Sequence, residues 1–512
     1  KKLLLGTFLL VGLTYFPASK LGSEFMPPLY EGDILYMPSM LPGVSITTAK
    51  QTLQQMDRII KSFPEVDTVF GKSGRAQTAT DSAPLSMIET VITLKPEIQW
   101  RKGMTPEKLV KELDAAIQFP GVTNAWTMPI KTRIDMLSTG IKTPVGIKLL
   151  GADLNVLAKL AEEIEAELRA VPGTASVFAE RVTGGNFLDI KIKREAISRY
   201  NLSIDDVQAV IMSAIGGMNV GNTVEGLERY PINVRYPREL RESLNGIKSI
   251  LVFSPMGHHV PLGELTTIKF VKGPPVIKTE GSKPSAWIYV DVNTSDIGGY
   301  VKKAKKIIES KVNIPAGYRL VWSGQFEYME RAAKRLQFII PITLIIVFLL
   351  LFLNFKNFTD SILIMLLLPI SLTGGFILLW LLGYDMSVAV GVGFIALTGV
   401  AAETGVVMLS YLNVALKDAK SKFSTFTSEN LYEVVMKGAS ERVRPLMMTV
   451  ASTIGGLLPI MWSSGSGASV MKRIAAPMIG GMVSATILTL FVIPVVYALI
   501  KKKWWIETPK SN

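Results

Sequence analysis

The chain has 512 residues, of which 48% are hydrophobic and only 19% are charged. This composition excludes a disordered chain and is unusual for a soluble enzyme. Because cysteine is absent, disulfides, thiolate zinc sites and thiol nucleophiles are excluded, and two histidines are too few for a multi-histidine metal centre. The 55 Lys and Arg residues exceed the 42 acidic residues, giving a net charge of +13. Nucleic acid binding or the cytoplasmic loops of a membrane protein would explain this excess.

The first apolar run covers residues 3–16 and follows Lys1 and Lys2. It fits either a signal peptide or the remainder of a transmembrane helix, and both place the next segment across the membrane. Since the chain does not begin with Met, we expect a truncated first transmembrane helix at residues 1–20.

Residues 21–334 form a long region in which an amphipathic helix, a Pro turn and a strand recur four times. The predicted helices are 48–61, 105–117, 154–169 and 301–311, and the predicted strands include 86–94, 187–193 and 286–292. We expect a large α+β periplasmic domain for pore formation and docking, built of split βαβ (ferredoxin-like) subdomains.

Five long apolar runs follow, at residues 336–355, 361–382, 386–412, 446–462 and 474–499. A bilayer core needs about 20 apolar helical residues, and glycines within these runs allow neighbouring helices to pack closely. We therefore expect a polytopic α-helical membrane protein with five further transmembrane helices in residues 335–503 and a cytoplasmic tail at 504–512.

Lys and Arg are concentrated in the connections that share a side of the membrane with Lys1 and Lys2. This asymmetry satisfies the positive-inside rule and explains part of the basic excess. It makes membrane lipid the expected surroundings and nucleic acid an unexpected partner.

Motifs for soluble chemistry are weak. Gly71-Lys72-Ser73 lacks the earlier glycine of a phosphate-binding loop. His258 and His259 are adjacent in a Gly-containing segment, where a hairpin turn is favoured over a cation site. No protein cofactor is expected, and the chain is not expected to be an enzyme.

Glu403 is the only Asp, Glu, Lys, Arg or His inside the five long apolar runs. A carboxylate in a membrane must face a polar interior, and desolvation favours its protonated form, so Glu403 is a candidate proton relay. The alternative is a structural hydrogen bond to a neighbouring helix. A relay also needs a partner charge, which these runs do not contain.

The 22 methionines include candidates for soft-metal ligands, because thioethers favour Cu(I) and Ag(I) over Zn(II). Most are expected to fill cores. In the predicted strand 86–94, Met87 lies on the face opposite Ile88 and Ile92, with polar neighbours. Met136 also has polar neighbours, and Met37 precedes Pro38 in an extended stretch.

Several stretches together carry a resemblance to the resistance–nodulation–division (RND) transporters. They are GDILYMPSMLPGVS, TRIDMLSTGIKTPVGIK, GGMNVGNTVEGLERYPINVRYPRELR, SGQFEYMERA, GFIALTGVAAETGVVML and MKRIAAPMIGGM. The chain resembles the C-terminal half of the heavy-metal efflux branch, closest to the copper/silver pumps of the Cus type. The resemblance runs through nearly the whole chain.

The resemblance implies that Met37, Met87 and Met136 form a periplasmic metal site, with Met218 and Met471 as weaker candidates on the metal path. It also implies that Glu403 relays protons, whereas the family's partner lysine corresponds to Leu446 here. The expected function is proton-driven export of Cu(I) or Ag(I), the transported substrate, by a secondary transporter in the bacterial inner membrane. Expected partners are two further copies in a homotrimer, a periplasmic adaptor and an outer-membrane channel.

Two alternatives stay open from the sequence. One is an RND pump for zinc-type or cobalt-type cations or for organic drugs. The other is a membrane receptor with a ligand-binding ectodomain, which would need a cytoplasmic signalling module beyond residue 503.

Overall fold

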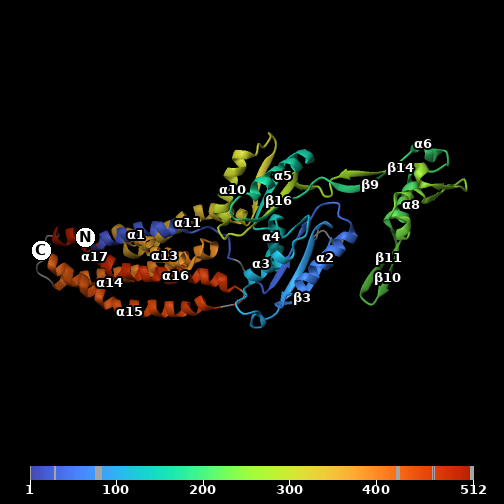
Figure 1. Ribbon diagram of the computed structural model, residues 1–512. Helices are drawn as coiled ribbons and strands as arrows, with labels where there is room; N and C mark the ends of the chain where they lie inside the picture. Colours follow the sequence, from blue (N-terminus) through green and yellow to red (C-terminus); the bar gives the residue numbers. More distant parts are fainter. Residues whose placement is uncertain are drawn as a thin grey trace. The chain divides into compact units, whose positions relative to one another are not determined.

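The computed structural model describes residues 2–27, 30–74, 83–422, 427–463, 465 and 467–507. The chain divides into two compact units (Figure 1). The first unit contains Lys1–Glu180 and Lys278–Asn512, and the second unit is Arg181–Ile277. The second unit is thus an insertion in the first, a division that the sequence analysis did not predict.

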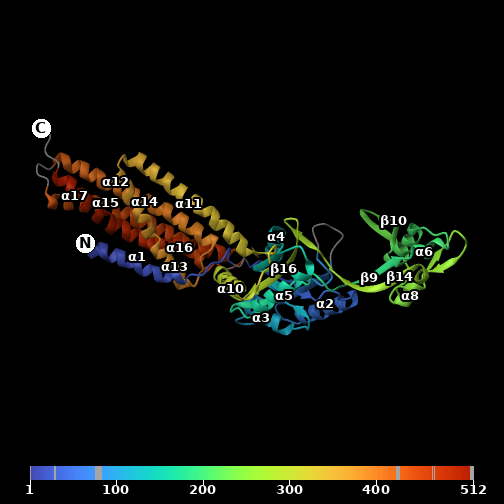
Figure 2. The same ribbon diagram turned by 90° about the horizontal axis from the view of Figure 1, so that it is seen from above.

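Within the described residues, six helical segments are long and apolar enough to cross a membrane. They are α1 (Lys2–Lys20), α11 (Gln325–Phe355), α12 (Phe358–Ser371) with α13 (Thr373–Leu382), α14 (Val388–Lys422), α15 (Ser428–Trp462), and α16 (Ala468–Ile487) continuing through the π-helical η4 (Leu488–Val492) into α17 (Ile493–Glu507). α13, α14 and α16 pack against one another, and both views show them side by side (Figure 2). The predicted apolar runs lie in these helices, except that Met386 and Ser387 precede α14.

Small residues bring α13 and α14 into backbone contact with α16. A Cβ atom on Gly374 would lie 2.1 Å from the Gly480 carbonyl oxygen, and one on Gly393 would lie 2.4 Å from the Ile474 carbonyl oxygen. The Ser484 hydroxyl strengthens the first contact by donating to the Ser371 carbonyl at 2.6 Å. These close approaches confirm the predicted role of glycine in helix packing.

The first sheet of the first unit has the strand order β3-β4-β1-β6, with antiparallel neighbours. The strands are β1 (Asp33–Tyr36), β3 (Val66–Ser73), β4 (Ile88–Leu94) and β6 (Trp126–Thr127). The amphipathic helices α2 (Ile46–Lys61) and α3 (Pro106–Ala116) contribute buried side chains to its core, among them Met56, Ile60, Leu109 and Leu113. The short strands β2 (Ser39–Met40) and β5 (Val122–Thr123) pair beside it, and η1 (Glu97–Gln99) and α4 (Pro129–Thr139) complete this part.

The second sheet has the order β15-β16-β7-β17, and β8 also pairs with β16. Its strands are β7 (Val145–Leu150), β8 (Thr174–Ala179), β15 (Lys278–Glu280), β16 (Lys283–Val292) and β17 (Arg319–Gly324). Helix α5 (Leu154–Arg169) packs on β16 and β8, and α10 (Ile297–Lys311) packs beside α5. Every residue of β7 is buried, so β7 forms the centre of this core.

The predicted succession of helix, proline and strand is present at all four places. α2 leads through Pro64 to β3, α3 through Pro120 to β5, α5 through Pro172 to β8, and α10 through Pro315 to β17. Proline follows a helix readily because it cannot continue the helical hydrogen bonding.

The second unit is built around β9 (Gly185–Ile192), which pairs with β14 (Thr266–Gly273). Two hairpins accompany it: β10 (Met218–Glu225) with β11 (Glu228–Val234), and β12 (Leu251–Phe253) with β13 (His259–Pro261). The helices α6 (Arg194–Ser198), α7 (Ile204–Val210), α8 (Leu244–Lys248) and α9 (Leu262–Leu265), together with η2 (Ile211–Gly216) and η3 (Arg238–Leu240), surround a core that includes Val207 and Leu262. His258 and His259 are exposed at the β12–β13 turn, as the hairpin interpretation predicts.

Candidate functional site

Met37 and Met87 lie on adjacent extended segments of the first sheet. Met37 follows β1 directly and is 1% exposed. Met87 immediately precedes β4 and pairs with Ser39, and the N–H of Ile88 donates to the Pro38 carbonyl at 3.2 Å. The backbone pairing therefore brings two of the three candidate ligands together.

The two faces of β4 are those that the sequence predicts. Ile88, Thr90 and Ile92 are fully buried, whereas the alternating residues between them are only half-buried. Met87 is half-buried like this second set. Its side chain is therefore on the less apolar face of the strand.

Met136 lies on α4, which contacts β1. The Glu31 carboxylate accepts two backbone N–H bonds from the first turn of α4, each at 2.7 Å, and so fixes the N-terminal end of the helix beside the segment that enters β1. At the other end, the N–H of Gly140 donates to the Met136 carbonyl at 2.8 Å, with Gly140 in the left-handed conformation. A Cβ on Gly140 would approach Trp287 to 2.4 Å, so glycine is required where α4 ends.

A buried amine lies between these segments. Lys142 is 7% exposed, and its Nζ donates to the Met37 carbonyl at 2.9 Å and to the Ser39 hydroxyl at 2.7 Å. Burial, reinforced by the charge of Lys278, lowers the pKa of Lys142 from 10.5 to about 7. Lys142 thus bonds to the segment of Met37, which pairs with the segment of Met87, and it lies three residues beyond the end of α4, which carries Met136. We use the name methionine cluster for Met37, Met87 and Met136, the three metal ligands that the sequence analysis predicts.

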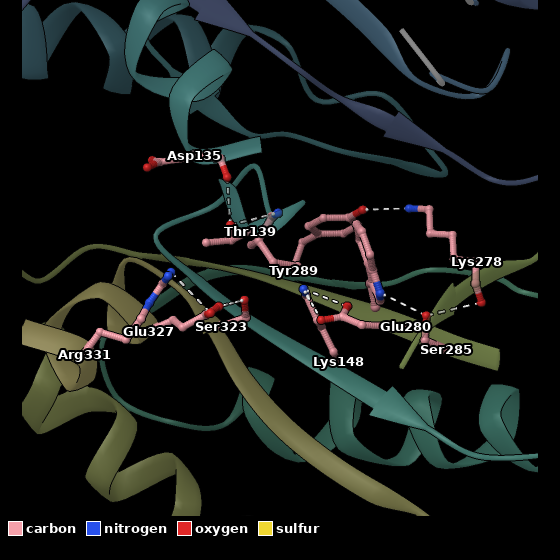
Figure 3. A network of polar contacts seen from close by, with 12 residues as sticks. Asp135, Thr139, Lys148, Lys278, Glu280, Ser285, Tyr289, Ser323, Glu327 and Arg331 are labelled. Carbon is pink, nitrogen blue, oxygen red and sulfur yellow. Dashed lines mark hydrogen bonds and ion pairs between the residues drawn. The ribbon is translucent and has the colours of Figure 1, made fainter. Parts of the chain in front are cut away.

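Beyond Lys142, a polar network continues across the second sheet (Figure 3). Lys278 Nζ lies 2.8 Å from Glu180 Oε1 and donates to the Tyr289 hydroxyl oxygen at 3.3 Å. Burial opposes the charge of Lys278, but Tyr289 and Glu180 outweigh it, and the pKa of Lys278 is raised. Lys148, the next lysine of the same sheet, pairs with Glu280 at 2.8 Å. One lysine of this region is thus held charged, while Lys142 is close to losing its proton at neutral pH.

The two weaker methionine candidates lie elsewhere. Met218 begins β10 in the second unit and is 48% exposed. Met471 lies in the first turn of α16 and is also 48% exposed. Neither residue therefore belongs to the first sheet or to α4, which carry the three stronger candidates.

Glu403 is exposed on α14, although its neighbour Ala401 is buried against Leu368 and Ala485. Among the residues that the structure describes, Glu403 has no hydrogen-bond or ion-pair partner. Leu446, at the position of the family's lysine, is 1% exposed and packs in an apolar cluster with Phe394. Glu403 therefore faces away from the helices of this chain.

Hard-ligand metal sites are absent from the described ranges, where no three His, Asp or Glu side chains gather as a potential metal site. The sequence predicts the three methionines as candidates but does not single out Lys142. Its only signal is a lysine near the start of the mostly buried stretch 141–150, which also contains Lys148.

Comparison with known proteins identifies the family. A model of the AcrB/AcrD/AcrF family matches residues 1–501. The chain belongs to this family. The resemblance to the RND transporters, and among them to the Cus-type heavy-metal branch, is confirmed by its relatives. A putative cation efflux system protein, SilA of Salmonella typhimurium, is 50% identical over 99% of the chain, and the cation efflux system protein CusA of Escherichia coli K12 is 49% identical over 98%.

More distant members of the AcrB/AcrD/AcrF family include the cation efflux system protein CzcA of Alcaligenes sp., 37% identical over 95% of the chain. A crystal structure of a heavy metal efflux pump matches 97% of the chain with a TM-score of 0.84 at 29% identity. The chain covers 48% of the length of SilA and CusA and 50% of that solved chain, so it spans about half of its relatives.

Proposed function

We propose that the chain is the C-terminal half of a proton-driven Cu(I)/Ag(I) efflux transporter, and that Met37, Met87 and Met136 bind the transported metal. The observation that supports the proposal is that three segments distant in sequence, each with one methionine, are neighbours: the segment of Met37 pairs with that of Met87, and α4 contacts β1. Three thioethers offer a soft, neutral ligand set that suits a monovalent soft cation.

The proposed site also accounts for the neighbouring charges. The Lys142 amine donates to the backbone carbonyl of Met37, so it lies near the methionine cluster while the Met37 sulfur stays available for a metal. A carboxylate-rich site would favour divalent cations, and the described residues contain no such group.

The organisation proposed for the chain follows the sequence analysis. Residues 1–20 form the first membrane helix, 21–334 the periplasmic domain, 335–503 five membrane helices and 504–512 a cytoplasmic tail, of which 508–512 lie outside the described residues. We interpret β7-α5-β8 and β16-α10-β17 as a split βαβ unit, because the two halves interleave in one sheet. Glu403 relays protons through contacts supplied by the other half of the transporter, which its exposed position on α14 leaves room for.

The complete transporter is proposed to be a homotrimer in the bacterial inner membrane, with a periplasmic adaptor and an outer-membrane channel as partners. The heavy-metal efflux relatives support a transporter over a receptor. The greater identity with SilA and CusA than with CzcA favours the copper/silver branch over a zinc-type pump.

The test is a titration of the complete, purified transporter with Ag(I) and with Zn(II). Met37→Ile, Met87→Ile and Met136→Ile each remove one soft donor at nearly constant volume, a change that costs less than about 1.5 kcal/mol in stability. Ag(I) affinity should fall in all three variants, and Zn(II) binding should hardly change. Met56→Ile is the matched control, because Met56 is fully buried in the core between α2 and the sheet. Unchanged Ag(I) affinity in all three variants would remove the chemical basis of the proposal.

A further inference from the structure

A short segment after α1, residues 22–25, connects the membrane helices to the periplasmic helix α10. Its backbone runs beside that of residues 386–388, which lead into α14. The N–H of Glu24 donates to the Met386 carbonyl at 2.9 Å, that of Met386 to the Gly22 carbonyl at 3.0 Å, and that of Val388 to the Phe25 carbonyl at 3.1 Å. Three backbone hydrogen bonds thus fix the start of α14 to this segment.

Asp385 joins the same segment to α10. Its Oδ1 accepts the N–H of Gly22 at 2.9 Å, and its Oδ2 accepts the hydroxyl of Ser295, which immediately precedes the residue that caps α10. One carboxylate at the start of α14 therefore holds both the post-α1 segment and the N-terminal turn of a periplasmic helix.

Asp296 repeats this arrangement from the periplasmic side. Its Oδ1 accepts the N–H of Gly299 at 2.9 Å, which caps α10, and the N–H of Ser23 at 2.7 Å. The N–H of Gly298 donates back to the Ser23 carbonyl at 3.1 Å. The capping carboxylate of α10 is thus shared with the segment that pairs with α14.

Glu24 adds a third helix. Its Oε1 lies 2.7 Å from Arg473 Nε, and the two side chains are only 3% and 13% exposed. Arg473 belongs to α16 and also stacks over the Tyr384 ring at 4.9 Å, beside Asp385. Removing either partner of a buried pair leaves an uncompensated charge, so this contact resists separation.

The segment after α1 is tightly packed against its neighbours. A Cβ on Gly22 would lie 2.7 Å from Asp296 Cβ and 2.7 Å from Asp385 Oδ1, and one on Gly298 would lie 2.0 Å from Ser23 Oγ. Close-packed groups move together, because any relative displacement breaks several contacts at once. We name Gly22, Ser23, Glu24, Asp296, Asp385 and Arg473 the coupling joint.

We propose that the coupling joint transmits movements of α14 and α16 to α10, so that Asp385 and Arg473 are positioning residues of the transport cycle. The inference rests on the proton-driven export proposed above. α14 carries Glu403, and α10 packs beside α5 on the second sheet, whose strand β7 lies close to Lys142 in the sequence. When a change of charge at Glu403 shifts α14, the contacts of Asp385 therefore pass this movement to α10 and the periplasmic sheets. In the described part of the chain, the lipid-facing surface of α14 makes no such contacts.

The experiment uses the complete transporter in liposomes. It measures two quantities, the rate of Ag(I) export and the proton flux that depends on Ag(I). Asp385→Ala removes both acceptors, and we expect the Ag(I)-dependent proton flux to fall at least about tenfold, equivalent to about 1.4 kcal/mol of lost coupling. Ag(I) binding to the purified variant should match the parent, since Asp385 is not near the methionine cluster. Asp385→Asn keeps an acceptor for Gly22 and should retain most of the coupling.

Two further variants keep the test decisive. Ser295→Ala is a mild change at an exposed residue and removes only the link from Asp385 to α10, so it should lower the flux in the same direction. Asp153→Ala removes the cap of α5 without touching a membrane helix and should leave the Ag(I)-dependent proton flux unchanged. A parental Ag(I)-dependent proton flux in both Asp385→Ala and Ser295→Ala, or an equal loss in Asp153→Ala, would overturn the inference. If the parent itself shows no Ag(I)-dependent proton flux, the proposed function fails first.

Discussion

The carboxylate of Asp291, a half-buried residue of β16, provides a quantitative test of the structure. Asp291 lies in β16, where its carboxylate accepts the N–H of Val292 at 3.0 Å. Burial raises the pKa of Asp291 from 3.8 to about 6; the Asp114 carboxylate adds to the shift, and Lys131 opposes it. Because the folded state disfavours the ionised form, Asp291 reduces stability as the pH rises from about 4 to above 6, and it has no such effect at lower pH.

Asp291→Asn removes this penalty and keeps an oxygen for the N–H of Val292. A shift from 3.8 to about 6 corresponds to about 3 kcal/mol in the fully ionised range. Some amide hydrogens of β16 exchange only when the sheet unfolds. In the variant these should exchange up to about 100-fold more slowly than in the parent at pH 7.5, but only about two- to threefold more slowly at pH 4.

The measurement is hydrogen exchange with mass spectrometry on the complete transporter, comparing variant and parent at the same pH so that intrinsic exchange rates cancel. Asp67→Asn is the control, since Asp67 is exposed on β3. The same ratio of exchange rates at pH 4 and pH 7.5 would refute the reasoning, because a neutral packing effect does not depend on protonation.

Two other predictions concern transport and the metal site. Glu403→Gln in the complete transporter should abolish metal export and leave Ag(I) binding intact, because an amide cannot cycle a proton; export at the parental rate would make Glu403 a structural residue. Gly140→Ala should weaken Ag(I) binding and lower the unfolding temperature, because the left-handed conformation costs about 1 kcal/mol for alanine and the new methyl group displaces Trp287 or the end of α4 that carries Met136. Titration and thermal unfolding check the second variant, and unchanged Ag(I) affinity would show that the position of α4 does not matter for binding.

Hydrophobic pattern alone predicts the helices of this chain well, but their ends less well. The helix predicted at 154–169 has these same bounds in the structure, because its apolar period is regular and Asp153 caps it. The helix predicted at 301–311 begins instead at Ile297, since Asp296 caps it and two glycines in its first turn look like helix breakers. α15 starts at Ser428, well before its apolar run, because polar helical turns continue beyond the part that a bilayer would cover.

The candidate site is only partly readable from sequence. Strand alternation correctly places Met87 on the face opposite Ile88, since the period of two is a local property. The proximity of α4, which carries Met136, to β1, which precedes Met37, depends in part on the Glu31 bonds, which join residues about a hundred positions apart. Lys142 and Arg473 were not recognised, because a lysine or arginine gives no local sign that tertiary structure will bury it.

The place of β7 in the second sheet has a consequence for biogenesis. β7 pairs with β16 and β17, and both partners follow the inserted second unit in the chain. Until they are synthesised, this buried strand, apolar except for Lys148, has neither of its neighbours, and such unpaired edges favour aggregation. The last of them, β17, ends at Gly324, and α11 begins at Gln325. The sheet can therefore close only after the chain has been synthesised up to the next membrane helix, and we expect residues 145–150 to need protection from aggregation until then.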